Sequence, residues 1–155
     1  NNKFIVDLNS SELDKVKAIS TKSYIEQYYL KAENGIEKKV RKKLINGETS
    51  YYLITKIYDN NKERKTHKVI SKVEYLYYLT QLDKKKSPIK KIRYSFKYNN
   101  EIYNLDMFAD NDYAILENET SKELVNLELP SFLNIIGIEN KKEILNSDVI
   151  SKRLS

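Results

Sequence analysis

Residues 37–58 read EKKVRKKLINGETSYYLITKIY and carry the strongest structural signal in the chain. Two segments that alternate in character, residues 37–44 and 51–58, flank the dipeptide Asn46-Gly47. Asn-Gly favours a tight turn between antiparallel strands because both residues tolerate positive φ. This stretch therefore predicts a β-hairpin, and with it a fold based on an antiparallel sheet.

Further strands and a few helices are predicted on both sides of this hairpin. Period-two and aromatic-rich segments indicate strands at residues 3–8, 24–31, 64–70, 89–98, 101–108 and 113–120, which makes about eight strands in all. Helices are expected at residues 10–20 after a cap at Ser10-Ser11, at 71–82 after a Ser71/Glu74 capping box, at 132–136 and at 141–145. We predict a β-dominated α+β fold in which one domain spans residues 1–155.

Length and composition restrict the class of protein. A chain of 155 residues can bury one continuous core, and it contains no Cys, so neither disulfides nor thiolate chemistry are expected. Neither an apolar run of about 18 residues nor a signal-peptide pattern is visible, so we expect a cytoplasmic protein without membrane contact. The net charge of +6 is compatible with nucleic acid, anionic lipid or a small anionic ligand.

The placement of the cations is more informative than their number. Successive residues of a strand point to opposite faces, so residues two apart share a face. This rule places Lys39, Arg41 and Lys43 on one face of their strand, and Lys56 on one face with Tyr52, Ile54 and Tyr58. It also places Lys91, Arg93, Ser95 and Lys97 on one face of a later strand, whose opposite face carries Ile92, Tyr94, Phe96 and Tyr98. A solvated outer sheet face would explain any one of these strands. Three such strands favour an interior whose positive charge an anion would neutralise.

Two glutamates could extend such a site with metal ligands. Glu117 and Glu119 are two residues apart in one predicted strand and could present two carboxylates to Mg²⁺, although an exposed face or ion pairs with lysines would equally explain them. Asp106 is a lone carboxylate in an apolar run, and His67 is interpreted as a packing or surface residue. A divalent ion between carboxylates and triphosphate would orient an attacking water for phosphoanhydride hydrolysis.

Other enzyme classes find little support in the sequence. It contains no Gly-rich phosphate loop, no Cys or His cluster of the kind that binds zinc, and no Ser with a suitable His and Asp partner. What remains is an ordered series of short motifs: Lys3-Phe4-Ile5, residues 25–30 (IEQYYL), residues 39–43 (KVRKK), Thr55-Lys56, Ile70-Ser71 with Glu74-Tyr75, residues 91–94 (KIRY), Leu105-Asp106, residues 115–119 (ILENE), and Leu129-Pro130 with Phe132-Leu133.

The order and spacing of these motifs resemble the CYTH-like, or triphosphate tunnel metalloenzyme, superfamily, particularly CYTH domains attached to P-loop ATPases. The resemblance covers nearly the whole chain and implies an eight-stranded antiparallel tunnel, a closed β-barrel with helices packed outside. It also implies that triphosphate is contacted by Lys3, Lys39, Arg41, Lys56, Lys91 and Arg93, and that Mg²⁺ or Mn²⁺ is held by Glu117 and Glu119. The family's opening signature is Glu-x-Glu-x-Lys, and Asn1 stands where its second Glu is expected.

We therefore expect a domain that binds inorganic triphosphate, thiamine triphosphate or a nucleoside triphosphate. The acidic motif, with Asn1 in place of its second Glu, leaves open whether the domain is also a divalent-metal-dependent triphosphatase, a hydrolase that releases phosphate or diphosphate. The alternative is a catalytically degenerate module that senses a ligand or docks onto a P-loop ATPase partner or fused domain. A nucleic-acid surface is disfavoured because the aromatic residues segregate from the cationic face, whereas single-strand binders interleave the two.

Overall fold

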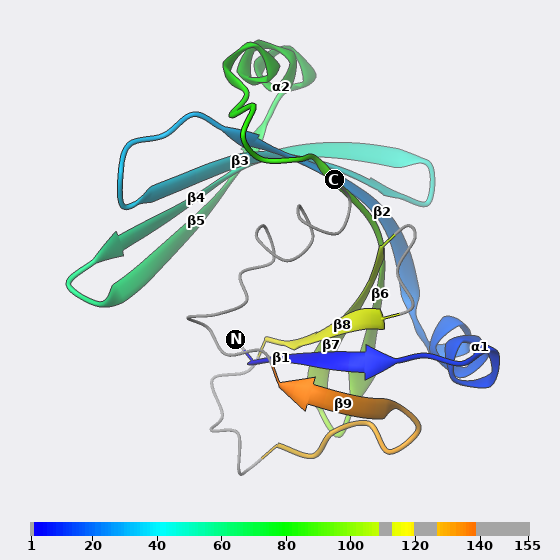
Figure 1. Ribbon diagram of the computed structural model, residues 1–155. Helices are drawn as coiled ribbons and strands as arrows, with labels where there is room; N and C mark the ends of the chain where they lie inside the picture. Colours follow the sequence, from blue (N-terminus) through cyan, green and yellow to red (C-terminus); the bar gives the residue numbers. More distant parts are fainter. Residues whose placement is uncertain (1, 109–112, 120–126, 139–155) are drawn as a thin grey trace. The chain divides into compact units, whose positions relative to one another are not determined.

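The computed structural model describes residues 2–108, 113–119 and 127–138, which form nine strands, two α-helices and one short 3-10 helix (Figure 1). All nine strands belong to a single sheet. The chain separates into two compact units. The central unit comprises residues 24–90, and the terminal unit combines the residues before 24 with the described residues from 91 onward.

Four antiparallel strands form the sheet of the central unit, in the order β5-β4-β3-β2. Their bounds are β2 (Thr21–Leu30), β3 (Ile36–Ile45), β4 (Glu48–Asp59) and β5 (Lys62–Ile70). Asn46 and Gly47 adopt φ values of 49° and 81°, which confirms the Asn-Gly hairpin predicted from the sequence.

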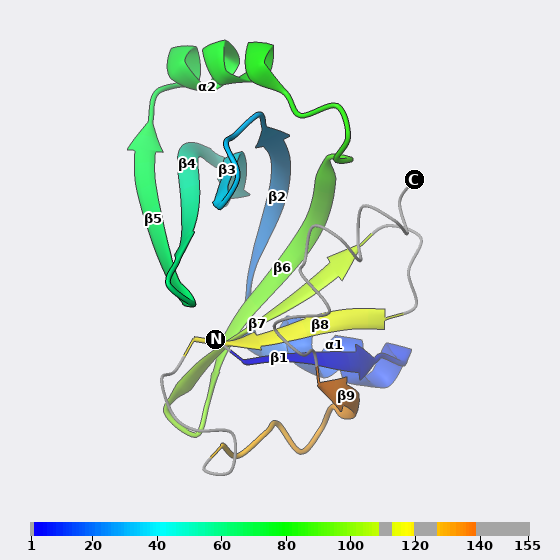
Figure 2. The same ribbon diagram turned by 60° about the vertical axis from the view of Figure 1, so that its left-hand side comes forward.

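One face of this sheet is covered by α2 (Lys72–Tyr78), which continues into the 3-10 helix η1 (Leu79–Gln81) (Figure 2). The buried residues of this layer are Leu30, Val40, Ile70 and Tyr75. The predicted capping box is confirmed, because the Ser71 hydroxyl accepts from the Glu74 amide and the Glu74 carboxylate accepts from the Ser71 amide, each at 3.0 Å. The covered face of the central sheet is therefore its apolar face.

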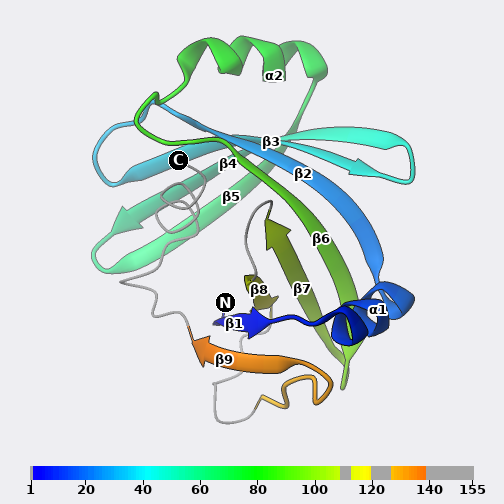
Figure 3. The ribbon, with the colours of Figure 1, turned by 45° about the vertical axis from the view of Figure 1, so that its right-hand side comes forward.

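The terminal unit contains five antiparallel strands in the order β6-β7-β8-β1-β9. They are β1 (Asn2–Asp7), β6 (Ile89–Tyr98), β7 (Glu101–Phe108), β8 (Tyr113–Asn118) and β9 (Asn134–Ile138), with α1 (Ser10–Ile19) following β1 (Figure 3). The core on one sheet face contains Phe4, Val6, Val16, Tyr94, Phe96, Tyr103, Leu105, Ala114, Leu116 and Leu133. The aromatic face predicted for residues 89–98 is thus the face that packs against this core.

The segment after Pro130 corrects one sequence prediction. The apolar spacing of residues 132–136 predicted a helix, but residues 134–138 form β9, which pairs with β1 through Val6 opposite Ile135 and Ile5 opposite Gly137. Apolar residues at 132, 133, 135 and 136 fit a helical stripe, while β-branched isoleucines also favour a strand. The available edge of β1 decides between the two, and it accounts for nine strands instead of eight.

Smaller differences concern element ends. Helix α1 is capped by Asn9, whose Oδ1 accepts from the Glu12 amide at 2.8 Å, and not by Ser10-Ser11. The helix predicted at residues 141–145 lies outside the described residues, as does the end of the strand predicted at 113–120. Closure into a tunnel and a single domain stay predictions. No helix in the described ranges is long and apolar enough to cross a membrane.

The capping box of α2 provides a direct test of this local structure. Replacing Ser71 by Ala removes the side-chain acceptor for the Glu74 amide and should lower the melting temperature by about 3 °C. Ser10→Ala is the matched control, because the cap of α1 is supplied by Asn9 and not by Ser10. Circular dichroism melts compare the two variants, and an equal loss in both would contradict the assigned caps.

Candidate anion-binding site

The terminal unit places two of the predicted cations around one carboxylate. Arg93 on β6 lies opposite Asp106 on β7, and Lys91 precedes Arg93 on the same face of β6. The Arg93 guanidinium donates from Nε to Asp106 Oδ1 at 2.7 Å and from Nη2 to Oδ2 at 2.9 Å. Lys91 Nζ lies 2.8 Å from Asp106 Oδ2. All three side chains are buried, so these residues form a bidentate pair extended by a second cation.

The electrostatics of this cluster follow from its burial. Burial by itself raises the pKa of the Asp106 carboxyl, but the charge of Lys91 and the hydrogen bonds and charge of Arg93 outweigh it and hold the pKa well below its usual range. Burial lowers the pKa of Arg93, whereas Asp106, Glu117 and Glu119 raise it. The acids outweigh burial, so the pKa of Arg93 is raised overall. Asp106 and Arg93 are therefore both ionised at neutral pH.

A second polar row lies next to this cluster on the same sheet face. Ser95 Oγ donates to Asn104 Oδ1 at 2.7 Å, and Asn104 Nδ2 donates to Glu119 Oε1 at 2.8 Å. The register places Glu117 opposite Asn104 on one side and opposite Lys3 on the other. Glu119 follows the last residue of β8. The structure thus brings Lys3, Glu117 and Glu119 to the face that also carries Arg93.

The central unit presents the remaining predicted cations. Lys39 and Arg41 are buried on β3, and Arg41 lies between Gln27 on β2 and Tyr52 on β4. Arg41 Nε donates to Gln27 Oε1 at 2.7 Å. Lys56 on β4 lies on the same face as these two cations but is more exposed than they are.

Two carboxylates surround Lys56. Its Nζ lies 3.9 Å from Glu37 Oε2 and 3.7 Å from Glu63 Oε1. Part of its charge is therefore offset within the chain, which makes Lys56 a weaker candidate for an anion contact than Arg41.

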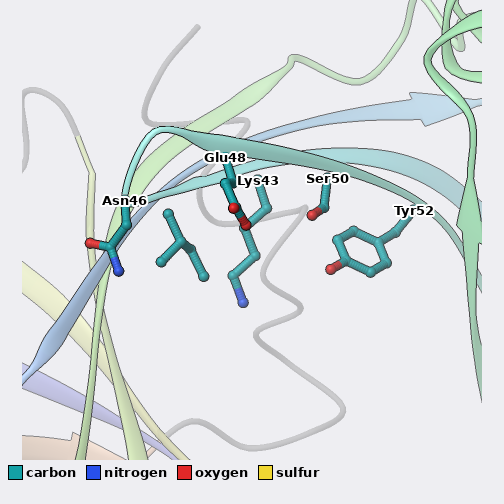
Figure 4. A pocket seen from close by; sticks show the side chains of 6 residues that line it. Lys43, Asn46, Glu48, Ser50 and Tyr52 are labelled. Atoms are coloured by element: carbon teal, nitrogen blue, oxygen red, sulfur yellow. The ribbon is translucent and has the colours of Figure 1, made fainter.

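A pocket opens on this face beside the β3–β4 turn. It has a volume of about 350 Å³ and is lined by Lys43, Ile45, Asn46, Glu48, Ser50 and Tyr52. Figure 4 shows Lys43, Ser50 and Tyr52 directed to the same side of the hairpin. Tyr52 also lies opposite Arg41 in the strand register, so the pocket lies beside the row that contains Arg41.

The residues present do not complete a metal site. Within the described ranges, no group of three or more His, Cys, Asp or Glu side chains is close enough to hold a metal ion. Glu117 and Glu119 supply two carboxylates, and one oxygen of Glu119 already accepts from Asn104. Mg²⁺ is usually held by one or two carboxylates together with water and phosphate oxygens, so these two glutamates would bind it only jointly with such ligands.

The buried residues carry an excess of positive charge. The buried charged side chains of the described ranges are Lys39, Arg41, Lys91 and Arg93 on one side and Asp106 on the other. Removing charged groups from water is costly unless opposite charge and hydrogen bonds replace the lost hydration. In each unit, these buried cations are the groups that an anion could contact.

Sequence reasoning did not assign roles to three of these polar residues. Gln27, Ser95 and Asn104 are neutral, and their function is visible only when the strand register places them beside Arg41 or Glu119. Asp106 was noticeable as a carboxylate in an apolar run, but its partners follow from the β6–β7 register. Asn104 and Asp106 are two residues apart on one strand and therefore share a face, which is the sequence signal that could have placed them in the same site.

Comparison with known proteins gives structural relatives only. No protein-family model matches the chain, and no curated protein matches its sequence. The inorganic triphosphatase NE1496 superposes with a TM-score of 0.58 at 18% identity, covering 99% of this chain and 96% of that chain. The PH1819 protein from Pyrococcus horikoshii OT3 superposes with a TM-score of 0.58 at 15% identity, covering 79% of each chain.

A conserved hypothetical protein from Pyrococcus furiosus, Pfu-838710-001, gives a TM-score of 0.55 at 14% identity and covers 78% of this chain and 79% of that chain. Together these likenesses show that the chain shares its fold with an inorganic triphosphatase and with these Pyrococcus proteins, in agreement with the fold that the sequence resemblance implied. At identities below 20% they show the fold alone.

The Lys91–Asp106–Arg93 cluster predicts a pH-dependent contribution to stability. Asp106→Asn leaves two buried cations without their carboxylate and should cost about 3–5 kcal/mol at pH 7. Because the pKa of Asp106 is lowered in the folded state, its stabilisation is complete above the ordinary carboxyl pKa of 3.8 and is lost as the pH falls through the folded value.

Urea unfolding at pH 7, 5 and 3 measures the gap between the wild type and Asp106→Asn. The gap should be similar at pH 7 and 5 and smaller at pH 3. Asp7→Asn is the control, since Asp7 is an exposed carboxylate in the same unit. A gap that does not change with pH would show that the carboxylate charge is not what stabilises the cluster.

Proposed function

We propose that this chain, which shares its fold with an inorganic triphosphatase, binds a triphosphate or related polyphosphate anion through cations on its sheet. The observation that carries the proposal is that each unit buries two cations on one face of its strands, Lys39 and Arg41 in the central unit and Lys91 and Arg93 in the terminal unit. An anion with several negative groups supplies the opposite charge that this arrangement favours. A single carboxylate or monophosphate supplies less of it.

The geometry of the strands suits an extended anion. Residues two apart on a strand lie on the same face about 7 Å apart, so Lys39 with Arg41, and Lys91 with Arg93, form short rows of donors. Guanidinium groups offer several N–H donors in a plane and can contact two phosphate oxygens at once. A linear polyphosphate presents its oxygens in a comparable row, whereas a compact anion contacts fewer of these donors.

Within this proposal the two arginines play different parts. Arg93 uses Nε and Nη2 for Asp106, which fixes its guanidinium in place and leaves its other N–H groups for the ligand. Arg41 is oriented by a neutral acceptor, the amide of Gln27. Lys3 is half-buried and would act at the margin of the site.

Metal-dependent hydrolysis is the second candidate activity. Two observations favour it: the fold shared with an inorganic triphosphatase, and the position of Glu117 and Glu119 close enough to raise the pKa of Arg93. Mg²⁺ is usually held by one or two carboxylates together with phosphate oxygens and water, so Glu117 and Glu119 would need the ligand to complete a metal site. Binding without turnover, as in a ligand-sensing module, is the alternative that needs no metal.

Anion binding is tested with tripolyphosphate and two pairs of neighbouring lysines. Lys39 and Lys91 are buried, whereas Lys38 and Lys90, one residue earlier, are exposed. Tripolyphosphate should raise the wild-type melting temperature and bind in calorimetry, because a ligand that prefers the folded state stabilises it. Lys39→Met and Lys91→Met should each weaken binding about tenfold.

The matched variants Lys38→Met and Lys90→Met remove the same charge and should bind close to the wild type. Lys39→Met is the more informative of the buried pair, since Lys91→Met also removes a partner of Asp106. Equal losses in all four variants would indicate nonspecific attraction by net charge. No binding by the wild type would reject the proposed function.

Hydrolysis is tested by phosphate release from tripolyphosphate, thiamine triphosphate and nucleoside triphosphates with Mg²⁺ or Mn²⁺. If the second candidate is correct, Glu119→Gln should reduce turnover at least about a hundredfold, since the carboxylate would hold the metal. Glu128→Gln serves as the control because its carboxylate accepts from Asn99 outside the cationic face. Absence of turnover in the wild type would leave binding alone as the function.

A further inference from the structure

A buried amide on β2 has an unused hydrogen-bond donor. Gln27 is completely buried, and its Nε2 group has no hydrogen-bond partner among the described residues. Its Oε1 is occupied, because it accepts from Arg41 Nε at 2.7 Å. A buried donor without a partner loses its hydration without compensation and is uncommon in folded proteins. Gln27 therefore calls for an acceptor that is not part of this structure.

The orientation of the amide is fixed by chemistry. Arg41 Nε can only donate, so the atom of Gln27 that faces it has to be the carbonyl oxygen. The opposite orientation would bring two donors together. The Nε2 group is consequently directed away from Arg41 Nε, and the missing partner has to accept hydrogen bonds.

The surroundings of Gln27 are suited to an oxyanion. The strand register aligns Gln27 with Arg41 and Tyr52 across β2, β3 and β4, and the next row on this face contains Lys43 and Ser50. Lys43, Ser50 and Tyr52 line the pocket of about 350 Å³ at this hairpin, a size in the range of small-molecule sites (Figure 4). Lys43, two hydroxyl groups and the carboxylate of Glu48 thus border an open volume, and Tyr52 connects this volume to the row of Arg41 and Gln27, which do not themselves line it.

We propose that Gln27 is a ligand-binding and positioning residue of the central unit. Its carbonyl oxygen holds the Arg41 guanidinium, and its Nε2 group donates to an oxygen of a phosphate-type anion that occupies the adjoining pocket. This inference rests on the proposed anion-binding function and assigns one contact of the anion to a neutral residue. It also places that contact in the central unit, on β2.

The contrast with Arg93 supports this assignment. Arg93 Nε is held by a carboxylate, Asp106, which has no N–H group to offer a ligand. Arg41 Nε is held by an amide, which accepts from the arginine and can donate to a second group at the same time. An amide at this position avoids the negative charge that would repel an anion.

Two substitutions at Gln27 distinguish the loss of its N–H donor from the addition of a negative charge. Gln27→Glu keeps an acceptor for Arg41 but replaces the donor by a negative charge, and Gln27→Met removes the donor without adding charge. Gln81→Glu is the matched control, because it makes the same change in the same unit at a half-buried residue of η1. Calorimetry with tripolyphosphate gives the affinity, and melting without ligand reports on folding.

The wild type and Gln81→Glu should bind tripolyphosphate with affinities within about twofold of each other. Gln27→Met should bind about tenfold more weakly, and Gln27→Glu more weakly still. If Gln27→Met changes the melting temperature but binds like the wild type, Gln27 is structural and the inference is overturned while the proposed function stands. If the wild type does not bind tripolyphosphate, both are overturned.

Discussion

Alternation of side chains along the strands is the constraint on which this protein depends. On β6, the same backbone that directs Tyr94 and Phe96 into the apolar core directs Lys91 and Arg93 to the opposite face. Those cations are buried as well. Apolar burial on one face of the sheet thus stabilises a structure whose other face holds charges away from water, so each buried charge needs a compensating group.

The chain meets this requirement in two chemically different ways. Asp106 shares one full negative charge between Arg93 and Lys91 and holds both side chains in place. Gln27 supports Arg41 with a neutral oxygen, which satisfies a hydrogen bond but adds no charge. The first arrangement keeps its arginine in place without any ligand. The second leaves the Nε2 group of Gln27 as a donor without a hydrogen-bond partner among the described residues.

The sequence predicted the parts of this structure that depend on local pattern. The hairpin around Asn46-Gly47, the capping box at Ser71 and the common face of Lys91 and Arg93 follow from turn chemistry and parity, and the structure confirms them. The helix expected at residues 132–136 was wrong, because pairing with β1 is a long-range interaction. The contacts of Asp106 and Gln27 were likewise invisible, since they depend on the register between strands and not on spacing within one.

The balance between acids and cations determines what such a sheet face binds. Around Lys56, Glu37 and Glu63 offset the positive charge locally, so that neighbourhood has little preference for an anion. Around Arg41, the hydrogen-bond partner on β2 is the neutral amide of Gln27. Because a buried carboxylate can serve either a metal ion or a neighbouring cation, each acid engaged by Lys or Arg is one fewer for metal binding.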